Sequence, residues 1–260
     1  MGEAGEGMRL DGRRVIVAGA SAGIGRSFAI RARRAGAEVV VGARRTDVLD
    51  EVVAEAGGGT AVALDVTDEA SCAAFLAGAL AELGGIDLML CTVGYAELRP
   101  LADVDEGTWA RTMATNLVGL NRLITGALPA LSPAGVVAVL SSETAAAPRH
   151  GLVPYAASKA ALEATLKGIR VEHPGTRVSC VVVGATFPTE FGASFDRELL
   201  GPAMASWRRH GLMQQQFMEP DEVARCLVDV LGAALRCPGV CIEEVVLRSP
   251  SPVIGAPGPA

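Results

Sequence analysis

The stretch VIVAGASAGIGR, from Val15 to Arg26, decides the fold, and it fits two different motifs. As a G-x-S-x-G turn, it would present Ser21 as the nucleophile of a hydrolase. As a glycine-rich loop, Gly19, Gly23 and Gly25 would link a strand to a helix and bind phosphate groups. The stretch by itself therefore leaves hydrolysis and nucleotide binding open.

The position of this stretch favours the phosphate-binding loop. In α/β-hydrolases the serine turn comes after earlier strands and a loop that supplies an oxyanion hole, whereas Ser21 follows the first strand-like run of this chain. In a phosphate-binding loop, Gly19 lets the chain turn, Gly23 lets the backbone approach a pyrophosphate, and Gly25 lets the helix pack closely on the strand. We therefore predict a dinucleotide site that includes these glycines, Ser21 and Ile24.

Short apolar runs alternate along the chain with longer segments rich in alanine, leucine and arginine. Runs that are apolar throughout are typical of parallel strands buried on both faces, and the segments between them are typical of crossover helices. The predicted strands are 14–20, 37–43, 60–66, 86–93, 135–142, 177–184 and 241–248, and the predicted helices are 24–35, 47–56, 69–83, 105–130, 154–172 and 220–235. The sequence thus predicts an α/β fold, a single-domain Rossmann fold with a doubly wound parallel sheet of about seven strands and helices on both faces.

The composition indicates one domain over residues 10–248, with a flexible extension at 1–9 and a flexible tail at 249–260. A net charge of −6 argues against a nucleic-acid partner. No apolar run reaches the roughly 18 residues of a membrane span, so we expect no membrane partner. The six cysteines are scattered without a C-x-x-C pair, and no secretory leader precedes them. We therefore expect a reduced, cytoplasmic protein without a metal site.

The end of the second predicted strand indicates which dinucleotide binds. NAD-selective sheets of this type carry an acidic side chain there, which holds the ribose 2′-hydroxyl. Here Ala43 stands at that position, and Arg44 and Arg45 follow it. Because guanidinium groups pair well with a phosphate dianion, we predict NADP(H) as the cofactor, with Arg44 as the first candidate for the 2′-phosphate and Arg45 as the second. The alternative is that both arginines only begin a solvated helix.

Three residues with catalytic chemistry lie in the second half of the chain. Tyr155 and Lys159 are four residues apart in a predicted helix, so they share one face of it. Ser142 stands at the carboxyl end of a predicted strand, where ligands bind in open α/β sheets. A tyrosine has an ordinary pKa of about 10, and a nearby ammonium group lowers it. We therefore predict that Tyr155 transfers a proton and that Lys159 lowers its pKa.

Further motifs occur in order along the chain, namely Asp65 in ALDVTD and Asn116 in MATNLVG. Together with the glycine-rich loop and the serine, tyrosine and lysine, they make the chain, from Leu10 to about Arg248, similar to the short-chain dehydrogenases and reductases. This resemblance implies that Asp65 binds the edge of the adenine, with Val66 beside it. For Asp65, the residues alone also allow the cap of a helix.

The same resemblance implies a role for each catalytic residue. Tyr155 would give its proton to the oxygen of a ketone while the nicotinamide delivers hydride to the carbon. Ser142 would polarise the carbonyl group, and Lys159 would hold the nicotinamide ribose. Asn116 would anchor a water molecule that links Lys159 to solvent, or it would only bond backbone inside a helix.

Two segments depart from the family's pattern. Ala18 replaces a threonine whose hydroxyl ties two strands together, and Cys91–Gly94 (CTVG) replaces N-N-A-G. Gly94 alone matches, and we expect it to line the cofactor cleft. The missing asparagines predict a loss of side-chain hydrogen bonds around the cofactor. The alternative function is therefore a non-catalytic NADP(H)-sensing protein of the same fold.

Residues 184–218 correspond to the family's substrate loop. Five of the ten aromatic residues of the chain fall in it. They are Phe187, Phe191, Phe195, Trp207 and Phe217. Such side chains line apolar pockets, although they would also serve to pack the loop on the core. Thr186 or Thr189 is expected to contact the nicotinamide carboxamide. We predict a ketoreductase for an apolar carbonyl or alcohol substrate, working as a homo-oligomer, either a dimer or a tetramer.

Overall fold

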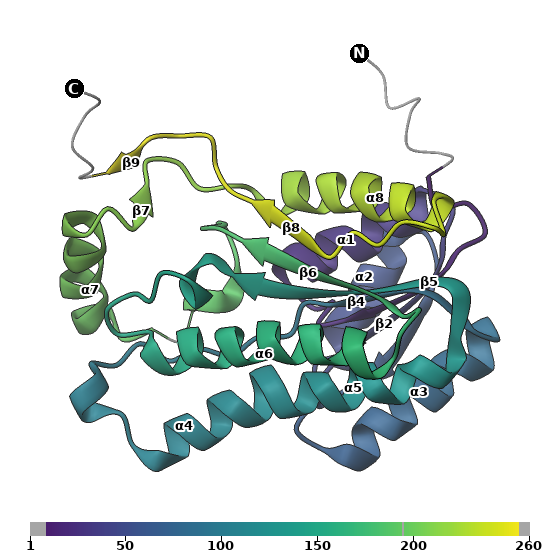
Figure 1. Ribbon diagram of the computed structural model, residues 1–260, viewed down its shortest axis with the longest axis horizontal. Coiled ribbons are helices and arrows are strands. Elements are labelled where there is room, and N and C mark those ends of the chain that lie inside the picture. The colour runs from purple at the N-terminus through teal and green to yellow at the C-terminus, as the bar shows by residue number, and fades with distance from the viewer. Residues whose placement is uncertain (1–8, 194, 255–260) are drawn as a thin grey trace.

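The computed structural model describes residues 9–193 and 195–254 (Figure 1). Its main sheet has seven parallel strands in the order β3-β2-β1-β4-β5-β6-β8. The strands are β1 (Arg14–Ala18), β2 (Glu38–Ala43), β3 (Thr60–Ala63), β4 (Ile86–Cys91), β5 (Leu131–Ser142), β6 (Arg177–Val183) and β8 (Glu244–Leu247). The order reverses direction at β1, and this switch point is where dinucleotides bind in such sheets. The predicted fold class is confirmed.

Helices cover both faces of this sheet (Figure 1). One face carries α1 (Gly23–Arg34), α2 (Thr46–Ala56) and α8 (Pro220–Arg236), and the other carries α3 (Glu69–Leu83), α4 (Glu106–Met113), α5 (Leu120–Ala127) and α6 (Val153–Glu172). Successive side chains of a strand point to opposite faces, so Val15 and Val17 of β1 join one core and Ile16 joins the other. Because both faces are buried, the strands read as continuous apolar runs.

The predicted helix at 105–130 is divided in the structure. After α4, the chain forms a π-helical segment at Ala114–Gly119 before α5, and a 3₁₀ turn at Leu128–Ala130 follows. A π-helical turn carries one extra residue, and such turns are frequent at functional sites. Asn116 lies in this segment and is completely buried.

The substrate loop contains structure that the sequence pattern did not indicate. It holds α7 (Arg197–Arg209) and the short strand β7 (Met213–Gln214), which pairs antiparallel with β9 (Val253–Ile254). The prediction of a free tail at 249–260 is therefore wrong for residues 249–254, because this end of the chain pairs with the loop. The predicted extension, up to residue 8, and residues 255–260 lie outside the described residues.

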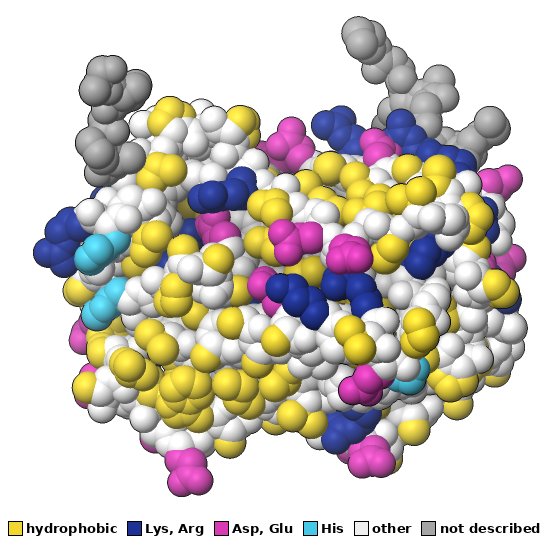
Figure 2. Space-filling model, viewed as in Figure 1, with side chains coloured by type: hydrophobic (Ala, Val, Ile, Leu, Met, Phe, Trp, Pro, Cys, Tyr) yellow, Lys and Arg dark blue, Asp and Glu magenta, His cyan; other side chains and the backbone are white. Residues whose placement is uncertain are grey.

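The surface carries charges of both signs. On the face viewed in Figure 2, basic and acidic side chains lie beside one another across the middle, with apolar side chains above and below them. Within residues 9–193 and 195–254, no helix is long and apolar enough to cross a membrane. The same residues contain no group of three or more His, Cys, Asp or Glu side chains arranged to hold a metal ion.

Candidate active site

The structure brings the three catalytic candidates together at the carboxyl end of the sheet. Ser142 is the last residue of β5, and Tyr155 and Lys159 lie in the first two turns of α6. The Ser142 hydroxyl is close enough to Tyr155 to lower its pKa through a hydrogen bond. Lys159 Nζ lies 5.8 Å from the centroid of the Tyr155 ring. These three side chains therefore share one site.

The environment of Tyr155 differs from the prediction in one respect. Its side chain is buried, and the ring of Phe191 lies 4.9 Å from it, centroid to centroid. Burial raises the pKa of Tyr155 to about 12, against the opposing effects of the Ser142 hydrogen bond and the Arg149 charge. The predicted lowering by Lys159 is wrong for this structure, because Lys159 is not among the groups that shift this pKa and burial outweighs the two that lower it. The phenol is therefore neutral at pH 7, which is the form that donates a proton.

Lys159 is almost completely buried, with 2% of its surface exposed. Its Nζ donates a hydrogen bond to the carbonyl oxygen of Leu140 at 2.9 Å. Burial lowers the pKa of this ammonium group from 10.5 to about 8. The side chain passes close to Gly94, where a Cβ atom would lie 3.8 Å from Nζ. The ammonium group of Lys159 therefore loses its proton at a lower pH than that of an exposed lysine.

Asn116 uses both ends of its amide to hold the chain that leaves β4. Its Oδ1 accepts from the backbone N–H of Tyr95 at 2.7 Å, and its Nδ2 donates to the carbonyl oxygen of Tyr95 at 2.8 Å. Nδ2 also donates to Ser158 Oγ at 2.9 Å, on the helix that carries Tyr155. Asn116 therefore fixes the segment after β4 to α6. The alternative expectation for Asn116 was that it only bonds backbone inside a helix. It does bond backbone, but that of Tyr95, which lies outside the helix of Asn116.

The glycine-rich loop has the geometry of a phosphate cradle. Gly19 has φ +95°, which a residue with a Cβ rarely adopts, and a Cβ on Gly25 would lie 2.3 Å from the Gly19 carbonyl oxygen. Helix α1 begins at Gly23, and the preceding residue, Ala22, supplies no side-chain cap to its free N–H groups. Such uncapped N–H groups at a helix N-terminus suit the pyrophosphate of a dinucleotide. The residues present therefore fit a dinucleotide cofactor.

The two departures from the family's pattern compensate for each other. Thr92, in the CTVG segment, donates from its hydroxyl to the carbonyl oxygens of Ala18 at 3.1 Å and Gly19 at 2.9 Å. The hydroxyl that Ala18 lacks is therefore supplied by the residue that follows β4, next to the last pair of β4 with β1, Cys91 with Ala18. The expected loss of side-chain hydrogen bonds is wrong for Thr92, whose hydroxyl ties the chain after β4 to the glycine-rich turn.

The two arginines after β2 behave differently. Arg44 is exposed and makes no hydrogen bond or ion pair with another described residue. Arg45 donates to Ser21 Oγ at 3.1 Å and to both carboxylate oxygens of Glu190, at 3.0 and 2.6 Å. Both lie at the carboxyl end of β2, where the 2′-phosphate is expected. Glu190 was not indicated by the sequence, because it lies 145 residues away from Arg45 in the chain.

Asp65 does not cap a helix. Its Oδ1 accepts from the backbone N–H of Thr67 at 2.9 Å and from its hydroxyl at 2.6 Å, whereas Asp68 caps α3. The Thr67 hydrogen bonds, and to a lesser extent the charge of Arg44, lower the pKa of Asp65. Its carboxylate is thereby held in a fixed direction beside Val66, which is buried.

The two threonines of the substrate loop take different positions. Thr186 donates to the carbonyl oxygen of Gly184 at 3.0 Å and bridges to Met218. Thr189 lies over the glycine-rich loop, with its Cγ2 3.4 Å from the position of a Cβ on Gly23. Thr189 thus approaches the phosphate-binding loop, and Thr186 fixes the base of the substrate loop.

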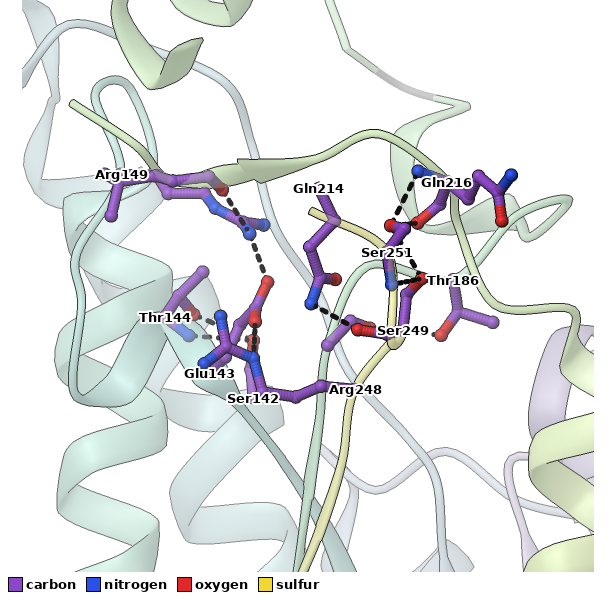
Figure 3. Close-up of polar contacts among 12 residues, drawn as sticks. Ser142, Glu143, Thr144, Arg149, Thr186, Gln214, Gln216, Arg248, Ser249 and Ser251 are labelled. Atoms are coloured by element: carbon purple, nitrogen blue, oxygen red, sulfur yellow. Dashed lines mark hydrogen bonds and ion pairs between the residues drawn. The ribbon is translucent and has the colours of Figure 1, made fainter. Parts of the chain in front are cut away.

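A second polar cluster lies next to Ser142. Figure 3 shows the carboxylate of Glu143 between the guanidinium groups of Arg149 and Arg248. The Arg248 pair has a distance of 3.1 Å from Nε to Oε2, and Arg149 also donates to the carbonyl oxygen of Leu212 at 2.8 Å. These residues line a cavity of about 330 Å³ that Ser142 borders. The only sequence signal for this cluster was the proximity of Glu143 and Arg149 to the catalytic residues.

Comparison with known proteins agrees with this geometry. The family model described as short chain dehydrogenase matches residues 13–199. The chain is 31% identical to the glycine betaine reductase ATRR of Emericella nidulans. The match covers 92% of this chain but only 19% of that protein. It is 28% identical to the 2-keto-3-deoxy-L-fuconate dehydrogenase of Xanthomonas campestris, over 85% of this chain and 74% of that one.

The solved structures show the same architecture. A short-chain dehydrogenase/reductase from Brucella melitensis superposes with a TM-score of 0.80 at 25% identity, over 96% of this chain and 98% of that one. The sheet order, the glycine-rich loop and the grouped serine, tyrosine and lysine therefore agree with the family match. The chain belongs to the short-chain dehydrogenases, a family of nicotinamide-dependent oxidoreductases that act on alcohols and carbonyl compounds.

Proposed function

We propose that this protein is an NADP(H)-dependent reductase that converts an apolar ketone or aldehyde into the alcohol. The observation that carries the proposal is the grouping of Ser142, Tyr155 and Lys159 beside a glycine-rich loop that fits a dinucleotide. A bound nicotinamide would supply the hydride. Residues of the loop, among them Ser21 and Ile24, would hold the dinucleotide.

The hydrogen bonds of Ser142 suit it to orient a carbonyl group. Its Oγ accepts from the N–H and the hydroxyl of Thr144, at 3.2 and 3.0 Å. Its own proton is therefore directed away from Thr144, toward Tyr155, and would be shared with a substrate oxygen bound there. Tyr155, neutral because burial raises its pKa to about 12, would then protonate that oxygen as the charge develops on it. Lys159, with its pKa lowered to about 8, is placed to exchange protons near neutral pH.

The preference for the phosphorylated cofactor rests on charge. The position after β2 that carries an acid in NAD-selective sheets is Ala43, and two guanidinium groups follow it. A 2′-phosphate dianion would be held by charge-assisted hydrogen bonds from Arg44 and Arg45. Asp65 and Val66 would contact the adenine, and Gly94 would line the nicotinamide end of the cleft.

The substrate loop supports an apolar substrate. Trp207 and Met213 are buried in a cluster that packs the loop on the body of the protein. Phe187, Phe191 and Phe217 are instead exposed, with 63%, 38% and 47% of their surfaces accessible. These three side chains are available to an apolar ligand. We further expect a dimeric or tetrameric protein in the cytoplasm, where its free thiols would stay reduced.

The test compares the only two tyrosines of the chain. Tyr155→Phe should lower NADPH oxidation with a carbonyl substrate by about 10²- to 10⁴-fold, the usual contribution of a general acid, while the Kd for NADPH changes little. Tyr95→Phe is the matched control, because the Tyr95 hydroxyl bonds Glu97 and Arg111 outside the catalytic group. Full activity of Tyr155→Phe would contradict the proposal. A wild type that binds NADPH but reduces no member of a broad carbonyl panel would favour the non-catalytic NADP(H) sensor.

A further inference from the structure

Three consecutive residues of the substrate loop cover the dinucleotide cleft. Thr189 lies against the position of a Cβ on Gly23, Glu190 binds Arg45, and the ring of Phe191 lies 4.9 Å from that of Tyr155. Residues 189–191 thus touch the phosphate loop, the arginine expected at the 2′-phosphate and the catalytic phenol. A dinucleotide bound along this cleft would therefore lie next to this segment.

The contact between Glu190 and Arg45 resembles a bound anion. Both carboxylate oxygens face the guanidinium group, at 3.0 Å from Nη1 and 2.6 Å from Nη2. The same Nη2 donates to Ser21 Oγ at 3.1 Å, which fixes the guanidinium over the glycine-rich loop. Paired N–H groups of this kind bind carboxylate and phosphate with the same fork geometry. The Glu190 carboxylate therefore occupies the donors that a 2′-phosphate would use.

We infer that Glu190 competes with the cofactor's 2′-phosphate for Arg45, which makes it a specificity-determining residue of the dinucleotide site. This inference rests on the proposed function and extends it. A phosphate dianion carries more charge than a carboxylate and displaces Glu190 from Arg45. A dinucleotide without the phosphate does not use the Arg45 donors, so the pair can stay intact when it binds. The ion pair therefore lowers the affinity for the phosphorylated cofactor more than for the unphosphorylated one.

The competition can be measured without turnover. Adenosine 2′,5′-bisphosphate and adenosine 5′-monophosphate differ by the 2′-phosphate and contain no nicotinamide. Calorimetry would give their Kd values for the wild type, Glu190→Gln, Arg45→Ala and the double variant. Glu198→Gln is the matched control, because Glu198 is exposed in the first turn of α7 in the same loop and its side chain makes no contact with Arg45 among the described residues.

Glu190→Gln should tighten binding of the bisphosphate about two- to fivefold, since an exposed ion pair contributes up to about 1 kcal/mol. Binding of the monophosphate should stay within about twofold, and Glu198→Gln should change neither value. In the Arg45→Ala background, Glu190→Gln should have no effect, because the competing pair is already absent.

Two results would overturn the inference about Glu190 and leave the proposed function intact. One is a wild type that binds the bisphosphate with the same Kd as Glu190→Gln, and the other is an equal gain for both nucleotides. A third result, no binding of either NADPH or the bisphosphate by the wild type, would overturn the proposed function as well. The failures of the two proposals are therefore distinguishable.

Discussion

Replacing Thr92 with valine tests how the cofactor loop is held. The change keeps the shape of the side chain and removes its hydroxyl, which is the only hydrogen-bond donor that the described residues offer to the Gly19 carbonyl oxygen. The Ala18 oxygen keeps a bond from the Thr92 backbone N–H at 2.8 Å. The Gly19 oxygen is partly buried, and leaving such an acceptor without its partner costs about 1–3 kcal/mol. A methyl group 2.9 Å from the Gly19 oxygen would also be crowded, because such contacts normally exceed about 3.3 Å.

We therefore expect Thr92→Val to lower the free energy of unfolding by about 1–3 kcal/mol in urea titrations. If about 1 kcal/mol of this loss weakens the loop conformation that binds NADPH, the Kd for NADPH rises about fivefold. Thr92→Ser retains the hydroxyl and should restore both values, which separates hydrogen bonding from packing. A Thr92→Val protein with the stability and NADPH affinity of the wild type would refute the role assigned to this hydroxyl.

Two further predictions concern buried charges. Because burial lowers the pKa of Lys159 from 10.5 to about 8, the unfolded chain binds more protons between these values, and stability should rise with pH across this window. Lys159→Met should remove this rise, which amounts to about 3 kcal/mol in urea unfolding. Lys167→Met, on the exposed side of α6, is the control and should keep the rise. The same dependence of stability on pH in both variants would contradict the lowered pKa of Lys159. The Arg14 hydrogen bond lowers the pKa of Asp87 from 3.8 to about 2, so Asp87→Asn should cost about 2 kcal/mol at neutral pH. That difference should disappear as the pH falls from about 4 to 2, and a pH-independent difference would contradict the linkage.

The fold was predictable because buried parallel strands give a clear pattern of apolar residues in the sequence. Each central strand is a run of apolar residues, and each crossover helix begins near a turn residue. The grouping of the three catalytic candidates was predictable for a similar reason, since Tyr155 and Lys159 lie four residues apart on one helix and Ser142 ends a neighbouring strand. Local spacing is enough to bring such residues together.

The remaining features depend on contacts between distant parts of the chain. Thr92 compensates for Ala18 only because β4 pairs with β1 in register, and the two residues are 74 positions apart. Strands β7 and β9 have two residues each, too few for a recognisable pattern, and they form because the loop and the chain end meet. The pKa of Tyr155 was mispredicted because its burial under Phe191 is a tertiary effect that motif spacing does not contain.

Residues 249–254 hydrogen-bond to the C-terminal part of the substrate loop and hold it in place. Gln214 Nε2 donates to the carbonyl oxygen of Ser249 at 3.0 Å, and the Gln215 N–H donates to that of Pro252 at 2.9 Å. A purification tag or truncation that disturbs residues 249–254 would therefore also disturb the substrate loop next to Tyr155, although these residues lie far from Tyr155 in the sequence. Recombinant versions of this enzyme should carry their fusions at the opposite terminus.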